Sequence, residues 1–146
     1  MTETLLVHGT CVAVDGRGVL LRGPPGAGKS DLALRLIDGG ALLVADDQTR
    51  IAADGDRLVA SAPPTIAGRI EVRGLGIVEA PGVASAPLGL VIDLVAAGEV
   101  ERLPPPRTCT LLGRSLPCLA LAPFEASAAA KVRIAVRALA AETLAR

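Results

Sequence analysis

The sequence predicts a single α/β domain over residues 1–146, built from a mixed sheet with flanking helices. Hydrophobic residues make up 51% of the chain but aromatic ones only 1%, so the core is aliphatic, as in sheets covered by helices. A length of 146 residues is enough for about one domain. The sequence GPPGAGKS at residues 23–30 lies between a predicted strand and a predicted helix, and this pattern fits a phosphate-binding P-loop.

Residues 23–30 supply the groups that a P-loop needs. The glycines let backbone N–H groups surround a phosphate, Lys29 reaches its terminal oxygens, and Ser30 offers a hydroxyl to Mg²⁺. A short apolar strand over 18–21 precedes the loop, and apolar residues at helical spacing over 32–37 follow it, so a phosphate is expected at the helix N-terminus. The predicted binding residues are Gly23, Pro24, Pro25, Gly26, Ala27, Gly28, Lys29 and Ser30.

The chain ahead of the loop is expected to be β-structure. Residues 5–14 predict two short strands with His8 and Gly9 near a turn, and residues 15–18 predict a hairpin turn into the strand before the loop. His8 is the only histidine in the chain. A structural role and an active-site role beside the loop are both open for it.

Two adjacent carboxylates follow the first helix, which residues 38–40 end with glycines. Residues 41–45 predict an apolar strand that ends in Asp46 and Asp47, the place where a P-loop enzyme sets a carboxylate on Mg²⁺. Because neighbouring strand residues point to opposite faces, both reach the site only where the strand has ended or bulges. Like charge and burial are then expected to raise the pKa of one, as a general base needs. An ordinary acidic turn is the alternative.

A second informative stretch is the predicted strand over 70–78. Glu71 and Arg73 alternate with apolar residues and are expected on one face, while Gly74 and Gly76 permit bends. Arg73 offers a guanidinium to a phosphate, unless this is a salt-bridged surface strand.

The other elements are simple β-hairpins, strands and one helix. The expected order is a hairpin over 48–60, a connector over 62–65, a strand over 89–95, an extended connector over 98–108 and a hairpin over 108–121 around Gly113-Arg114. A helix over 127–144 ends the chain. Its expected inward residues are Val132, Ala135, Val136 and Leu139, and its expected outward residues are Lys131, Arg133 and Arg137.

Composition excludes several classes of protein. Fifteen basic and fifteen acidic residues cancel, and the chain has no set of aromatic residues on which bases could stack, so no nucleic-acid partner is expected. The N-terminus lacks a signal-peptide pattern and every apolar run is short, so we expect a cytoplasmic protein without a membrane span. The three cysteines lack CxxC spacing and are expected to be buried free thiols.

Four features occur in an order that resembles bacterial HPr kinase/phosphorylase: His8-Gly9, GPPGAGKSD, the strand ending in Asp46-Asp47, and EVRGLGIV at 71–78. The last is similar to that family's signature. The resemblance implies a fold like the nucleotide-binding core of phosphoenolpyruvate carboxykinase. It also implies a protein serine kinase that uses ATP and Mg²⁺ to phosphorylate the phosphocarrier HPr of a phosphotransferase system, with reversal by phosphorolysis as a further activity.

The resemblance also implies roles for individual residues. The P-loop with Lys29 binds the β- and γ-phosphates, and Arg73 contacts phosphate in the reverse reaction. Of Asp46 and Asp47, one serves the metal and the other is the base, which His8 tunes. The implied metal residues are Ser30, Asp31, Asp46 and Asp47. The Gly113-Arg114 pair is similar to a late Gly-Arg pair of the family.

Departures from the family pattern shape the remaining expectations. Asp31 replaces the usual glutamate, and the segment 79–89 lacks an expected arginine. The chain resembles the catalytic-domain-only forms of alphaproteobacteria, and a homo-oligomer stays open. There is no HRD, DFG or VAIK pattern, which excludes an ordinary protein kinase. The alternatives are a small-molecule kinase of the P-loop type and a non-catalytic nucleotide-sensing module.

Overall fold

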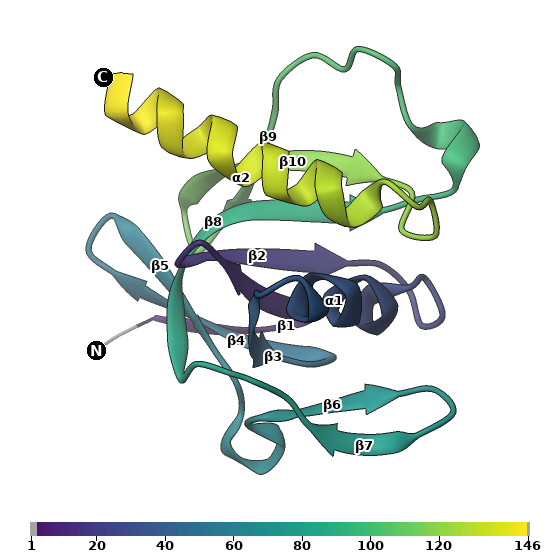
Figure 1. The fold of residues 1–146 in the computed structure, drawn as a ribbon. Helices are drawn as coiled ribbons and strands as arrows, with labels where there is room; N and C mark the ends of the chain where they lie inside the picture. The colour runs from purple at the N-terminus through teal and green to yellow at the C-terminus, as the bar shows by residue number, and fades with distance from the viewer. Residues whose placement is uncertain (1–2, 146) are drawn as a thin grey trace.

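Most strands of the chain belong to one mixed sheet that curls and closes on itself (Figure 1). The computed structural model describes residues 3–145; Met1 and Thr2, part of the N-terminus in which no signal peptide is expected, lie outside the described residues. The elements are β1 (Thr4–Val14), β2 (Arg17–Arg22), α1 (Lys29–Asp38), β3 (Leu42–Ala45), β4 (Gln48–Asp54), β5 (Arg57–Ser61), a 3-10 turn (Pro64–Ile66), β6 (Arg69–Val72), β7 (Gly76–Glu79), β8 (Ser85–Leu94), a 3-10 turn (Ala97–Glu99), β9 (Arg107–Leu111), β10 (Arg114–Leu121) and α2 (Ala128–Ala145).

The pairing of the strands forms a ring. The order is β2-β1-β4-β5-β8, and β8 pairs again with β2, so the hydrogen bonding returns to its start. Strands β10 and β9 continue the sheet beyond β8, β3 pairs with β1, and β6 and β7 form a separate two-stranded sheet. The β2–β8 and β8–β10 pairs are parallel and the other pairs of the large sheet are antiparallel, which confirms the predicted mixed sheet.

Two aliphatic cores lie on the two faces of this sheet. Both helices cover one face, where β2, β8 and β10 run behind them (Figure 1). The inward residues of α1 and α2 are as the 3.6-residue period predicts: Leu32, Ala33, Leu36 and Ile37 on α1, and Val132 and Val136 with partly buried Ala135 and Leu139 on α2. The second core fills the inside of the ring with Cys11, Leu20, Ile51, Leu58 and Val91 among others.

The prediction of two short strands over residues 5–14 is wrong, because β1 is one strand of 11 residues. It changes partners instead of turning: Thr4 to His8 pair with β4, and Gly9 to Val14 pair with β2. Gly9 marks the change because its backbone passes close to β2. A Cβ there would lie 2.8 Å from the carbonyl oxygen of Leu21, so this glycine serves a close approach, not a turn.

The prediction of a single strand over 70–78 is also wrong, because this stretch is the β6–β7 hairpin. Gly74 and Gly76 have φ values of 94° and 103°, which glycine adopts easily and which allow the chain to reverse. Arg73 therefore lies in the turn and does not share a strand face with Glu71.

The remaining predicted elements are present. The strand expected over 89–95 begins earlier, at Ser85, and Arg133 is half-buried where an outward position is expected, since its guanidinium donates to the Arg35 carbonyl at 3.3 Å. All three cysteines are free thiols; Cys11 and Cys118 are buried and Cys109 is half-buried. Within residues 3–145, neither helix is long and apolar enough to cross a bilayer.

Candidate functional site

The glycine-rich loop between β2 and α1 is held by the lysine that follows it. Lys29, the first residue of α1, is 8% exposed, and its Nζ donates to the carbonyl oxygens of Gly23 (2.6 Å) and Pro24 (3.3 Å). The Ala27 N–H donates to Pro24 at 3.0 Å, which closes a turn. A Cβ at Gly23 would come 2.9 Å from the Cβ of Ala27, so only glycine fits this tight loop. The loop thus carries its ammonium at the N-terminus of α1, where an anion is favoured.

Asp46 is the centre of the polar contacts beside this loop. Its carboxylate is 8% exposed and accepts three hydrogen bonds: from Ser30 Oγ (2.7 Å), from Thr10 Oγ1 (3.1 Å) and from the backbone N–H of Glu71 (2.9 Å). These donors come from α1, β1 and β6, which are distant in sequence. Asp46 therefore fixes the helix, the sheet and the β6–β7 hairpin relative to one another.

Asp47 follows at a sharp corner between β3 and β4. Its φ is 65°, and the Gln48 N–H donates to the Asp46 carbonyl at 2.7 Å, the i→i+2 pattern of a γ-turn. Two contacts hold the corner: the Asp47 N–H donates to Thr10 Oγ1 at 3.0 Å, and the Gly9 N–H donates to the Asp47 carbonyl at 2.9 Å. Because β3 ends at Ala45, the strand no longer sends the two carboxylates to opposite faces. Asp46 is buried and Asp47 is exposed.

His8 and Arg73 flank this corner from two sides. His8 pairs with Gln48 in the β1–β4 ladder and lies two residues before Thr10, so it shares the strand face from which Thr10 reaches Asp46. Its side chain is exposed. Arg73 lies two residues after Glu71 in the hairpin turn and is also exposed; within residues 3–145 its guanidinium has no ion pair or hydrogen bond.

Two predicted positions are not brought to this corner. Asp31 pairs with Arg35 on the surface of α1, with Arg35 Nη2 2.9 Å from its Oδ2, and not with Ser30 and Asp46. Arg114 starts β10 and donates to the Gly55 carbonyl at 2.7 Å. Strands β2, β8 and β10 run parallel, so the start of β10 lies at the edge opposite the loop that follows β2. The structure thus gives Gly113-Arg114 a structural role between two hairpin turns.

An ion pair fixes the residue before the loop. Arg22 ends β2 and forms two hydrogen bonds to Asp93 of β8, Nε to Oδ1 at 2.8 Å and Nη2 to Oδ2 at 3.2 Å. Burial alone raises the pKa of Asp93, but the hydrogen bond and charge of Arg22, with smaller contributions from Cys118 and Arg107, outweigh it and lower this pKa below its usual value. Burial and the nearby Asp93 carboxylate raise the pKa of the Cys118 thiol to about 11, so it stays protonated and donates to Asp93 at 3.4 Å.

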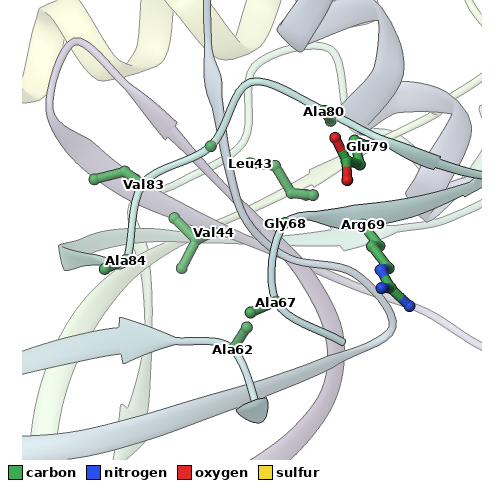
Figure 2. Close-up of a pocket in the computed structure, with 11 residues that line it drawn as sticks. Leu43, Val44, Ala62, Ala67, Gly68, Arg69, Glu79, Ala80, Val83 and Ala84 are labelled. Atoms are coloured by element: carbon green, nitrogen blue, oxygen red, sulfur yellow. The ribbon is translucent and has the colours of Figure 1, made fainter. Parts of the chain in front are cut away.

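A pocket of about 680 Å³ lies elsewhere, at the base of the β6–β7 hairpin (Figure 2). In the view, Leu43 and Val44 of β3 lie near the centre of the lining, and Arg69 and Glu79 lie at the right. The glycine-rich loop does not line it. Its lining combines small aliphatic residues with the charged Arg69 and Glu79. It includes neither Asp46 and Asp47 nor the residues that hydrogen-bond the Asp46 carboxylate, a group called the Asp46 corner below, so these polar contacts lie outside the pocket.

The residues at the corner fit a phosphate chain and a hard cation. Gly23, where a Cβ would meet Ala27, and the buried ammonium of Lys29 suit an anion in the loop. Ser30 Oγ and Asp46 Oδ1 are hard oxygen donors 2.7 Å apart, the ligand type that Mg²⁺ prefers. Within the part of the chain that the structure describes, no three His, Cys, Asp or Glu side chains gather closely enough to hold a metal by themselves. A divalent cation here would therefore share its coordination with phosphate oxygens, as Mg²⁺ commonly does.

Two contacts of the corner were not predicted. Thr10 lies on the same strand face as His8, and period-2 alternation could have found it. The Glu71 N–H donor carries no sequence signal, because a backbone group is common to all residue types except proline.

The family model of the HPr serine kinase C-terminal domain matches residues 1–96. The chain is 43% identical over 101 residues to an HPr kinase/phosphorylase of Clostridium tetani, covering 69% of this chain and 32% of that protein. It is 46% identical over 99 residues to one of Caldanaerobacter subterraneus, covering 65% of this chain and 32% of that protein. The chain thus spans about a third of the length of these two relatives. A solved HPr(Ser) kinase/phosphatase of Coxiella burnetii superposes with a TM-score of 0.85 at 28% identity, over 97% of this chain and 93% of the other.

Proposed function

Because this chain belongs to the HPr serine kinase C-terminal domain family, we propose that it transfers the γ-phosphoryl group of ATP to a serine of the phosphocarrier HPr. The observation that carries the proposal is the Asp46 corner. There the hydroxyl after the loop lysine meets a buried carboxylate at 2.7 Å, and an exposed carboxylate follows in the next residue. Phosphoryl transfer depends mainly on positioning and charge stabilisation, and this corner offers both.

The two carboxylates suit different roles. Asp46 already bonds Ser30, so it would hold Mg²⁺ with that hydroxyl, and the metal would neutralise charge on the phosphates when bound. Asp47 is exposed next to it and would accept the proton of the acceptor serine. Residues 23–30, acting as a P-loop, would bind the phosphates, with Lys29 on the terminal ones. His8 shares the strand face of Thr10 and would adjust the base by a hydrogen bond.

The β6–β7 hairpin is our candidate for the HPr-binding side. Its strand β6 is attached to Asp46 through the Glu71 N–H, so the hairpin is anchored at the corner that would do the chemistry. Two large apolar residues at its far end are exposed, Leu75 by 77% and Ile77 by 72%. Large apolar side chains that are exposed close together are typical of protein-binding surfaces.

The reverse reaction is a second candidate, supported by Arg73. This cation stands exposed in the hairpin turn. In phosphorolysis, inorganic phosphate attacks the phosphoserine, the serine P–O bond breaks, and pyrophosphate and free HPr result. Arg73 could hold the incoming phosphate. We propose further that residues 1–146 form one cytoplasmic catalytic domain with a fold like the phosphoenolpyruvate carboxykinase core, and a homo-oligomer stays open.

A phosphorylation assay tests the forward reaction. Purified protein is incubated with γ-labelled ATP, Mg²⁺ and HPr, and acid-stable phosphoserine on HPr is measured. Label on HPr from the wild type but not from Lys29→Ala is expected. ATP consumption that ignores HPr but responds to a metabolite would favour a small-molecule kinase. ATP binding without any transfer would favour a sensing module.

The reverse assay uses phospho-HPr and inorganic phosphate, with pyrophosphate as the readout. Arg73→Ala is expected to lower pyrophosphate release about tenfold or more while changing forward transfer less, since a phosphate contact of this kind is typically charge-assisted. Equal losses in both directions would assign Arg73 to a step common to both.

A further inference from the structure

The only phenylalanine of the chain lies against the glycine-rich loop. The sequence has one Phe and neither Trp nor Tyr. Phe124 follows β10 and is 69% exposed. A Cβ built at Gly28 would lie 2.9 Å from Phe124 Cζ and 3.0 Å from the ring of Pro123. The aromatic ring therefore stands at the N-terminus of α1, beside the end of the loop.

The segment that carries Phe124 is attached to α1 on both sides of the ring. Arg35 Nη2 donates to the Pro123 carbonyl, and Arg35 Nη1 donates to the Glu125 carbonyl at 3.2 Å. Asp31 pairs with the same guanidinium at 2.9 Å. The carboxylate expected at the metal thus supports the arginine that fixes the position of Phe124.

The topology puts this ring at the same edge of the sheet as the glycine-rich loop. Strands β2, β8 and β10 run parallel, so the loop after β2 and the segment after β10 leave the same edge. In parallel α/β sheets, ligands bind outside the carboxyl ends of the strands, and β2, β8 and β10 form the parallel part of this sheet. A nucleotide with its phosphates in the loop would have Phe124 beside it if its base extended along this edge. Aromatic side chains are usually buried in a folded protein. An exposed aromatic ring that is held in place at this edge therefore indicates a binding surface.

We propose that Phe124 packs its ring against the purine base of the nucleotide whose phosphates the glycine-rich loop binds. This inference rests on the proposed function and deepens it, because it names the residue that distinguishes a nucleotide from an inorganic polyphosphate. It also explains Gly28: with φ of 100° and no side chain, this residue lets the ring lie next to the loop. Two neighbouring structural elements thereby act on one ligand, the loop on its phosphates and Phe124 on its base.

Calorimetry with ATP and with inorganic tripolyphosphate tests the proposal. We expect Phe124→Ala to weaken ATP binding roughly tenfold to hundredfold, the range found for loss of base–aromatic stacking. Tripolyphosphate affinity is expected to change less than about twofold, because tripolyphosphate has no base. Phe124→Leu keeps an apolar side chain over Gly28 and should show the same selective loss for ATP, which keeps the test valid if the alanine variant is unstable.

A fluorescence titration gives an independent readout. Phe124→Trp introduces the only tryptophan of the chain, and its emission is expected to respond to ATP and ADP but not to saturating tripolyphosphate. The control is Ile134→Trp, at a site on α2 that is 62% exposed and whose emission should respond to neither.

The outcomes separate the two proposals. If the wild type binds neither ATP nor tripolyphosphate, the proposed kinase function fails and this inference fails with it. If the wild type binds ATP and the Phe124 variants bind it equally well, only the inference is overturned. Unchanged ATP affinity combined with a raised KM for HPr would instead assign Phe124 to the acceptor protein.

Discussion

The Asp46 corner is hydrogen-bonded to strand β6 of the β6–β7 hairpin, but it differs from the hairpin tip in exposure and in hydrogen bonding. Asp46 is 8% exposed and its carboxylate is hydrogen-bonded to three elements, whereas Leu75 at the hairpin tip is 77% exposed. A carboxylate that must act on a metal and phosphates needs a fixed place, and buried hydrogen bonds provide it. A surface that receives another protein has to stay accessible. Under the proposed function, this difference would assign the phosphate donor to the buried corner and the acceptor protein to the exposed hairpin.

The strongest test of the comparison removes the exposed carboxylate of the corner. Asp47→Asn should lower kcat for HPr phosphorylation by about 10²–10⁴ while leaving ATP affinity nearly unchanged, because only proton transfer is lost. Asparagine tolerates a positive φ, so the corner with its φ of 65° should remain folded. Steady-state kinetics and calorimetry measure the two effects. The matched control is Asp15→Asn, an exposed aspartate in the β1–β2 turn with φ of 50°, which should behave as wild type. Full activity of Asp47→Asn would place the base outside the corner.

The next test weakens the support of the corner. Thr10→Val removes the hydroxyl that donates to Asp46 and accepts from the Asp47 N–H. We expect kcat to fall roughly tenfold to hundredfold and the free energy of unfolding to fall by about 1–3 kcal/mol, since buried polar groups lose their partner. Thr49→Val is the control: Thr49 is equally buried but donates to the Gly9 carbonyl. It should lose stability with a much smaller loss of kcat. Equal kinetic losses in both variants would mean that stability alone is being measured.

A smaller effect is expected at the hairpin tip. The double variant Leu75→Ser/Ile77→Ser should raise KM for HPr several-fold without changing ATP affinity, because the loss is confined to the accessible surface. Its free energy of unfolding should change by less than about 0.5 kcal/mol, as for most surface substitutions. KM values and urea denaturation provide the readouts. Ile134→Ser, also an exposed apolar position but on α2, is the control, and a comparable rise in KM there would remove the hairpin as the acceptor side.

The last test concerns stability inside the ring, at Cys11, which follows Thr10 on β1 and lies in the second core. Burial raises the pKa of Cys11 to about 12, partly offset by a hydrogen bond from the Val19 backbone. Below pH 9 the thiol is protonated in both states. Between pH 9 and 12 only the unfolded state releases the proton, so the free energy of unfolding should fall by up to about 1.4 kcal/mol per pH unit. Urea denaturation from pH 8 to 10.5 should show a steeper fall for wild type than for Cys11→Ala. Parallel curves would mean that Cys11 does not titrate this way.

The predictable parts of the structure are those that local pattern determines. The loop lies between a short aliphatic strand and a helix whose apolar residues keep the 3.6-residue period, and no distant contact is needed to recognise it. Hairpins with Asp15-Gly16 and Gly55-Asp56 follow from turn chemistry. The two strand errors have a common cause. Gly9, Gly74 and Gly76 were each compatible with a turn, a bend or a close approach, and only the neighbouring strands decide among these.

The unpredicted parts of the site depend on long-range contacts. The place of Asp46 and Asp47 after an aliphatic strand predicts them as site residues, but it does not predict that the hydroxyl of Thr10 reaches them from another strand. Asp31 was assigned by its place after the loop serine. The structure pairs it with Arg35, because one helical turn brings these residues together on the surface. Phe124 lies about a hundred residues from the loop in sequence, and no local pattern connects the two.

The closed ring of strands limits where the chain can accept an insertion without disturbing the site. The strand that ends at the loop, β2, is paired on both sides, and both partners belong to the same closed circuit. A register shift of β2 by one residue would turn its inward side chains outward. Every other strand of the ring would have to shift with it. The number of residues in these strands therefore determines the distance between Gly23 and Asp46. One residue inserted into β2 or the second half of β1 should abolish the site, whereas an insertion at Asp15-Gly16 or Gly55-Asp56 should be absorbed by the turn.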